Sequence, residues 1–129
     1  MQTLSRPSTD LKPSLDASDV EQTDKAIAHL RKVINKTLTP KVQDIDLKGE
    51  FPAQIMHDIG AAGAFSHAVS SQYEGSGKGL KYAVQSIEEV SKDCLSTGFI
   101  AWCQVACTWY LVNTENSALR EKLLPEVAS

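Results

Sequence analysis

The stretch that decides the fold is Leu95–Val112, with the sequence LSTGFIAWCQVACTWYLV. No charged residue falls between Asp93 and Glu115, so a helix here would be apolar almost all the way round. Such a helix is either the buried centre of a helical bundle or a membrane span. A span needs about 20 strongly apolar residues, whereas this run is interrupted by Ser96, Thr97, Gly98, Gln104 and Thr108. The interruptions favour the buried helix, with the membrane span as the alternative.

A helix that is buried on all sides has to be covered by other helices, and the first of these is predicted to begin at Ser18. Residues Ser18–Glu21 match a capping box, in which a serine and a glutamate satisfy free backbone groups of the first turn. Apolar residues then recur at helical spacing. They are Val20, Ile27, Leu30, Ile34, Leu38, Val42 and Ile45. Pro40 lacks a backbone donor, so it should kink or end this helix near Thr39.

Three further helices are predicted. Phe51-Pro52 should open a short one, because proline suits the first helical turn, and Gly60 and Gly63 should close it. The next covers residues 80–94, and its apolar side should contain Leu80, Val84, Ile87, Val90, Ser91 and Cys94. The last begins near Glu115 and should turn inward Leu119, Leu123, Leu124 and Val127. We therefore expect an all-α bundle of about five helices around a buried central helix, Ser96–Val112.

Residues 64–79 connect two of these helices and end in the glycine run GSGKG at 75–79. A glycine loop in front of a helix can bind phosphate through free backbone N–H groups. The glycine spacing here matches neither the dinucleotide-binding fingerprint nor the P-loop, and no strand is predicted before it. We therefore expect this connector to be a flexible loop.

Composition excludes some classes of function. The 129 residues suit one domain, and a net charge of −3 argues against a nucleic-acid-binding surface, which needs clustered lysine and arginine. Arg31, Lys32 and Lys36 lie together on the first helix and should form a solvated face. Residues 1–17 are polar, with two prolines and no apolar signal core, so we expect a flexible leader before a helical domain at 18–129.

With no secretion signal, a cytoplasmic and reducing location is expected, so the three cysteines need not pair. Cys103 and Cys107 are four residues apart and share a helix face, as small buried thiols of the core would. The sequence around them offers no histidine and too few further ligands for a metal site. We therefore expect no bound metal.

Several short motifs follow one another in a fixed order along residues 18–129. They are Leu38-Thr39-Pro40, Gly49-Glu50-Phe51-Pro52, Ile59–Gly63, Tyr73 with the glycine run, Ile87–Val90 with Cys94–Thr97, and Lys122–Ser129. In this order and spacing the chain resembles the N-terminal helical domain of the acyl-CoA dehydrogenase family. It departs from the family pattern at Ser70, where proline is usual nearby, and at Glu74, where glycine is usual. These departures concern the subfamily more than the fold.

The resemblance implies a flavoenzyme that uses FAD to desaturate an acyl-CoA thioester. In that family a carboxylate base removes the proton alpha to the carbonyl, and the flavin takes the hydride from the beta carbon. The base and most flavin contacts belong to a middle β-domain and a C-terminal helical domain, which residues 1–129 do not include. No catalytic residue can therefore be carried over to this chain, which should be inactive alone.

One substrate site can be carried over from the resemblance. In the family, the helix that matches Leu95–Val112 forms part of the wall of the acyl-chain cavity. The matching positions are Gly98, Phe99, Trp102, Cys103 and Ala106. A tryptophan at position 102 that faced the cavity would shorten it and imply a short or unusual acyl group. The alternative is that Trp102 and Trp109 are ordinary core aromatics.

Three functional hypotheses follow. The first is the N-terminal domain of an acyl-CoA dehydrogenase-like oxidoreductase, with acyl-CoA and the remaining domains of the flavoenzyme as its partners. The second keeps the architecture but changes the reaction to that of a related flavin-dependent monooxygenase. The third is a non-catalytic helical binding module, which would expose a large apolar face and self-associate or bind a partner through it.

Overall fold

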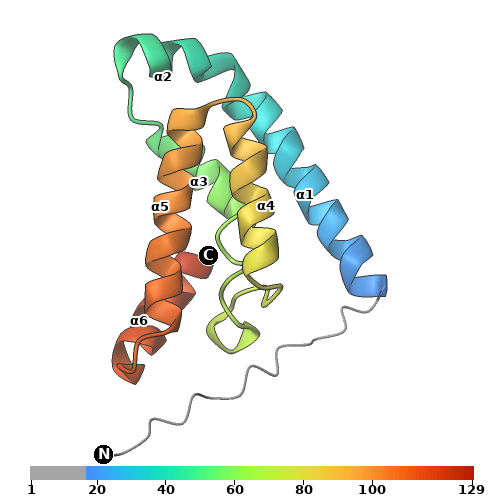
Figure 1. Ribbon diagram of the computed structural model, residues 1–129, viewed down its shortest axis with the longest axis vertical. Helices are drawn as coiled ribbons and strands as arrows, with labels where there is room; N and C mark the ends of the chain where they lie inside the picture. The colour runs from blue at the N-terminus through green and yellow to red at the C-terminus, as the bar shows by residue number, and fades with distance from the viewer. Residues whose placement is uncertain (1–16) are drawn as a thin grey trace, which may run out of the picture.

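The computed structural model describes residues 17–129, and every regular element within that range is helical (Figure 1). The α-helices are α1 (Ala17–Thr37), α2 (Val42–Lys48), α3 (Ala53–Ala61), α4 (Leu80–Ser91), α5 (Leu95–Val112) and α6 (Ser117–Ala128). Two 3₁₀ turns, Thr39–Lys41 and Ser71–Tyr73, lie between them. Apart from the seven-residue α2, the helices are the expected five, so the all-α class is confirmed. The predicted leader at 1–17 lies outside the described residues except for Ala17.

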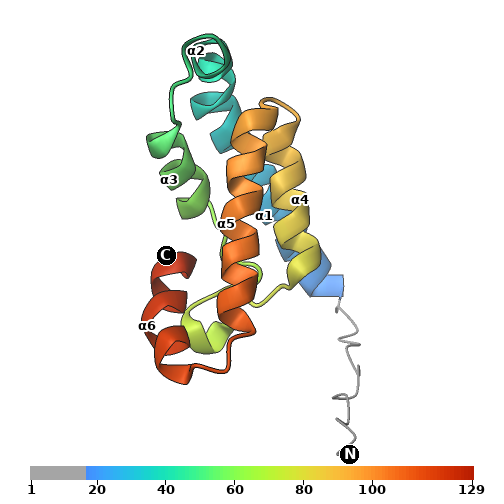
Figure 2. The ribbon, with the colours of Figure 1, turned by 60° about the vertical axis from the view of Figure 1, so that its left-hand side comes forward.

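The helices α5, α4 and α1 lie side by side in Figure 1, with α4 packed against both of the others. Figure 2 shows α3 and α6 to one side of α5, where α6 packs against α5, while α3 packs against α1. Apolar side chains from most of these helices meet in the core. The fully buried ones include Leu30, Ile34, Leu38, Ile59, Val90 and Leu124.

The first predicted helix is divided as Pro40 requires. The α1 helix ends at Thr37, Pro40 lies in the 3₁₀ turn, and α2 continues the apolar stripe with buried Ile45. Gly49 then closes α2 at φ = 65°, a left-handed conformation that glycine adopts at little cost. The predicted cap is wrong in position, because α1 includes Ala17 and Ser18 therefore lies inside the helix.

The connector at 64–79 is folded, so the prediction of a flexible loop is wrong. Its first half is buried, with Phe65, His67 and Val69 among the buried residues. Its second half turns back and donates backbone hydrogen bonds to the first, including Ser76 N–H to Ser66 O at 3.1 Å. A Cβ at Gly75 would lie 2.0 Å from the Val69 carbonyl oxygen. Gly75 thus allows the two halves of the connector to approach closely. Composition alone had indicated a mobile loop.

The buried side of α4 also differs from the prediction. The residues that α4 buries are Tyr82, Ala83, Ser86 and Val90. Leu80 and Val84, predicted to face inward, are exposed. Small residues at 83 and 86 let α4 approach its neighbours, and the larger aliphatic side chains are left on the outer side. The predicted side is therefore right around the end of α4, where Val90 and Cys94 are buried, and wrong near its start.

The basic cluster predicted that Arg31 lies on a solvated face, and this prediction is wrong for Arg31. Its guanidinium donates to the carboxylates of Glu89 and Asp93 on and after α4, and to the Glu89 carbonyl at 3.0 Å. Asp93 also accepts from the Thr39 hydroxyl. Lys32, in contrast, is exposed as expected. Arg31 therefore joins α1 to the end of α4 through a charged network.

Candidate functional site on helix α5

Helix α5 begins with an unusual cap. The Cys94 sulfur accepts hydrogen bonds from the Thr97 backbone N–H at 3.4 Å and from the Thr97 hydroxyl at 3.2 Å. A free N–H of the first turn is thus satisfied by a thiol where serine or aspartate is usual. At the other end, the Asn113 side-chain amide donates to the Trp109 carbonyl at 2.7 Å. These contacts end the helix at Leu95 and Val112, close to the predicted boundaries Ser96 and Val112.

One face of α5 is buried, and its residues are Thr97, Gly98, Ala101, Val105 and Thr108. These small or branched side chains allow α4 and α5 to pack closely. The closest approach is at Gly98, where an added Cβ would lie 2.1 Å from Ser91 Oγ and 3.0 Å from Ser91 Cα. Gly98 is therefore required where the two helices touch.

The opposite face of α5 is exposed, so the expectation of a central helix buried on all sides is wrong for these residues. Leu95, Phe99, Trp102, Trp109 and Tyr110 are all exposed. On α4, Leu80 and Val84 are exposed as well. We call the five exposed residues of α5 the exposed apolar face. The physical reason is that α4 and α6 cover only part of the circumference of α5, and the described chain supplies no further helix.

The structure divides the five residues predicted to line a substrate cavity. Phe99 and Trp102 lie on the exposed apolar face, with 62% and 52% of their surface exposed. Their rings stack with centroids 5.6 Å apart and planes 25° apart. Cys103 and Ala106 are half-buried beside them. Gly98, in contrast, is buried against α4, so its role in the described fold is helix packing.

The cysteines also differ from one another. Cys94 is buried, Cys103 is half-buried and Cys107 is exposed. The expectation of small buried thiols is thus wrong for Cys107, which lies on the part of α5 that no other helix covers. The capping role of Cys94 was not predicted, because cysteine is not among the residues usual at a helix N-cap.

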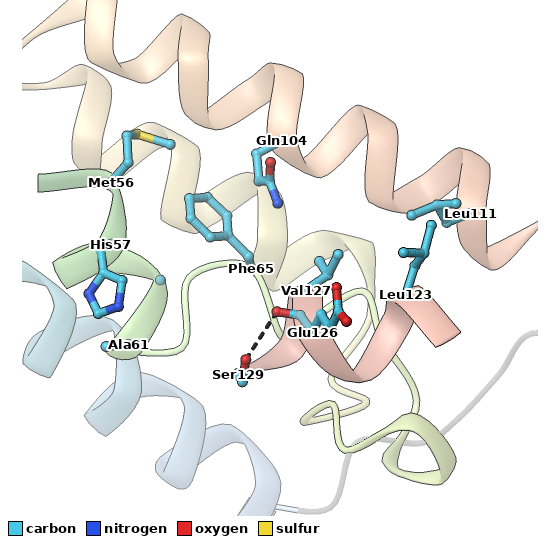
Figure 3. Close-up of a pocket in the computed structure, with 11 residues that line it drawn as sticks. Met56, His57, Ala61, Phe65, Gln104, Leu111, Leu123, Glu126, Val127 and Ser129 are labelled. Carbon is cyan, nitrogen blue, oxygen red and sulfur yellow. Dashed lines mark hydrogen bonds between the residues drawn. The ribbon is translucent and has the colours of Figure 1, made fainter. Parts of the chain in front are cut away.

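A cleft of about 530 Å³ lies elsewhere, between α3, α5 and α6. Figure 3 shows Phe65 and Gln104 pointing into it, Leu123 and Val127 of α6 on one side, and His57 of α3 on another. None of the five predicted site residues lines this cleft. Sequence reasoning missed it because its walls come from three helices and the connector, which no local pattern relates to one another.

Metal ligands and a membrane-spanning helix are two further features to consider in the described residues. Within residues 17–129, no group of three or more His, Cys, Asp and Glu side chains is placed to hold a metal ion. By length and composition alone, α5 is the one described helix that could cross a membrane. That signal is weak, because the core helix of a soluble protein gives it too. Here α5 packs one face against α4 and contacts α6.

The all-helical architecture of the described residues is consistent with the family that the sequence matches. The family model described as acyl-CoA dehydrogenase, N-terminal domain, matches residues 21–129. The chain belongs to this family. The domain thus has the identity that the order of its sequence motifs predicted.

Two relatives show how much of a longer protein the domain corresponds to. It is 32% identical over 101 residues to the mitochondrial isovaleryl-CoA dehydrogenase of Pongo abelii, covering 76% of this chain and 24% of the relative. It is 38% identical over 64 residues to the probable acyl-CoA dehydrogenase YngJ of Bacillus subtilis (strain 168), covering 49% of this chain and 17% of that protein. No solved structure matches the chain. The domain spans about a quarter of the first relative's length.

Proposed function

We propose that these residues are the N-terminal domain of an FAD-dependent, acyl-CoA dehydrogenase-like oxidoreductase that acts on the CH–CH bond of an acyl-CoA. In this proposal the domain is inactive alone and supplies part of the acyl-chain pocket from Phe99 and Trp102 on the exposed apolar face. The observation that carries the proposal is that face, found on a domain whose family relatives are several times longer. Monomeric proteins rarely leave such a contiguous apolar surface in water, so further domains and an acyl chain are suitable partners for it.

The described residues do not fit FAD on their own. The feature that most resembles a phosphate-binding loop is the glycine run before α4. Several of its N–H groups are already used, because Gly77 donates to Val69 O and Gly79 donates to His67 O, each at 2.8 Å. A pyrophosphate would have to replace these internal hydrogen bonds to bind the loop as a phosphate-binding loop does. In the proposal, most flavin contacts therefore come from outside residues 17–129.

The proposal is tested on the natural polypeptide, purified from its source cells. We expect an intact mass well above 14.0 kDa, a bound flavin spectrum, and bleaching of the flavin when an acyl-CoA is added under anaerobic conditions. A heavier flavoprotein that instead consumes oxygen and hydroxylates its substrate would support the monooxygenase alternative. A polypeptide of 14.0 kDa that forms concentration-dependent oligomers without flavin would replace the proposal with the helical binding module.

A specific prediction concerns the size of the acyl group. The stacked rings of Phe99 and Trp102 occupy the exposed apolar face, so we propose that they limit the length of the pocket. Replacing Trp102 with alanine in the complete enzyme should raise kcat/KM for an eight-carbon acyl-CoA relative to a four-carbon one. The expected change is about tenfold or more, because a single methylene contributes roughly 10- to 200-fold in a fitted apolar pocket.

The matched control is Trp109→Ala, which removes the other tryptophan of the same face. Trp109 does not occupy any of the five predicted cavity positions, so its variant should keep the wild-type chain-length profile. An unchanged profile in Trp102→Ala would mean that Trp102 is a packing residue, and the proposed limit on acyl length would be abandoned.

A further inference from the structure

The connector between α3 and α4 is closed around a buried histidine. His67 is 4% exposed, and its Nδ1 lies 2.9 Å from Ser76 Oγ, so this contact joins the two halves of the connector. Its ring lies 6.2 Å from the ring of Tyr82 on α4. Its own carbonyl accepts the Gly79 N–H immediately before α4 begins. His67 therefore contacts both halves of the connector and helix α4.

The surroundings of His67 provide no negative charge to balance an imidazolium. Lys78 lies in the same connector and opposes protonation of the ring. On α4, Lys81 places its ammonium 5.6 Å from the centre of the Tyr82 ring. Glu74 lies at the exposed end of the connector, and Arg120 lies on α6, which packs against the 3₁₀ turn. Among the described residues, no carboxylate forms an ion pair with His67.

We propose that residues 64–79 form an acid-released segment, in which neutral His67 holds the connector closed on α4 and protonated His67 opens it. Burial first, and the charge of Lys78 second, lower the pKa of His67 below its ordinary value of 6.5. The open segment therefore binds a proton more tightly than the closed one. The stability of the closed connector is full above pH 6.5 and decreases as the pH falls below that value.

Opening would affect more than the connector. Phe65 lines the cleft between α3, α5 and α6, and Val69 is fully buried. The 3₁₀ turn at 71–73 packs against α6. Release of the segment would thus remove one wall of the cleft and one support of α6, while leaving the Arg31 network between α1 and α4 in place. This inference concerns the described residues and is independent of the proposed function.

The test is hydrogen exchange of the natural polypeptide between pH 7.5 and 5.0, corrected for the intrinsic pH dependence of exchange. The amides of Ser76, Gly77 and Gly79 should lose protection as the pH falls, while core amides of α1 around Ile34 keep theirs. The loss approaches tenfold for each unit by which the pKa of His67 differs between the closed and open forms. Equal pH dependence in the connector and in α1 would overturn the proposal.

Two variants identify the group responsible. His67→Gln keeps a polar side chain near Ser76 but cannot gain a charge, so its connector should show no acid-dependent loss of protection. His57→Gln, the matched control at an exposed histidine, should behave like the wild type. If His67→Gln does not fold, Lys78→Gln tests the proposal instead. With less repulsion in the closed form, its connector should lose less protection on acidification than the wild type, and an equal or greater loss would contradict the proposal.

Discussion

Replacing Gly98 with alanine is expected to lower the free energy of unfolding by about 3 kcal/mol, the upper part of the range for overpacking a well-packed core. The new Cβ would lie 2.1 Å from Ser91 Oγ, and rotation of that hydroxyl would not be sufficient. Ser91 Cβ and Cα would still be only 2.9 and 3.0 Å away, so α4 and α5 would have to separate. Separation would also weaken the packing of Ala101 and Val105 along the same interface.

Urea denaturation followed by circular dichroism would measure this loss. Ser96→Ala is the matched control, because Ser96 is exposed on the same helix and alanine there should be neutral or slightly stabilising. The double variant Ser91→Gly/Gly98→Ala places the small residue on the other helix and should recover part of the lost stability. A Gly98→Ala variant as stable as Ser96→Ala would show that α4 and α5 are not in the contact described.

The second large effect is expected at Arg31. Replacing it with methionine keeps much of the aliphatic stem but leaves the carboxylates of Glu89 and Asp93 without their guanidinium partner. Their side chains are each 14% exposed, so water compensates only in part. We expect a loss of about 2 kcal/mol, below the roughly 3–5 kcal/mol for breaking a fully buried pair, because the arginine is 27% exposed.

The control for Arg31→Met is Lys25→Met on the same helix. Lys25 pairs with Glu21, but both side chains are more than two-thirds exposed, and such pairs contribute little. Arg31→Lys should fall between the two, since lysine keeps the charge but cannot donate a planar fork of hydrogen bonds. Equal stability of the two methionine variants would mean that Arg31 is solvated, as the sequence suggested.

Local chemistry in the sequence was enough to predict most helix boundaries. Pro40 ends the first helix through its own missing donor, so this boundary does not depend on distant residues. The length and uncharged character of α5 likewise come from consecutive residues. These features, with the order of the motifs, were sufficient for the fold class and for the family.

Features that depend on a distant partner could not be predicted in the same way. Arg31 looks solvated until Asp93, far along the chain, is placed beside it. Leu80 and Val84 look buried because they are apolar, but which side of α4 is covered depends on how closely α5 approaches. The resemblance placed Gly98 together with Phe99 and Trp102, yet neither it nor helical spacing could show that Gly98 is covered by α4.

The exposed apolar face has a consequence for how the protein is synthesised. A polypeptide leaves the ribosome from its N-terminus, and N-terminal domains generally fold first. In the longer protein that we propose, α5 would be complete before the residues that cover it had been translated. For that interval the uncharged flank of α5 would face water, where exposed apolar surface promotes aggregation. Nascent chains arrested shortly after this domain should therefore depend on chaperones far more than the finished protein does.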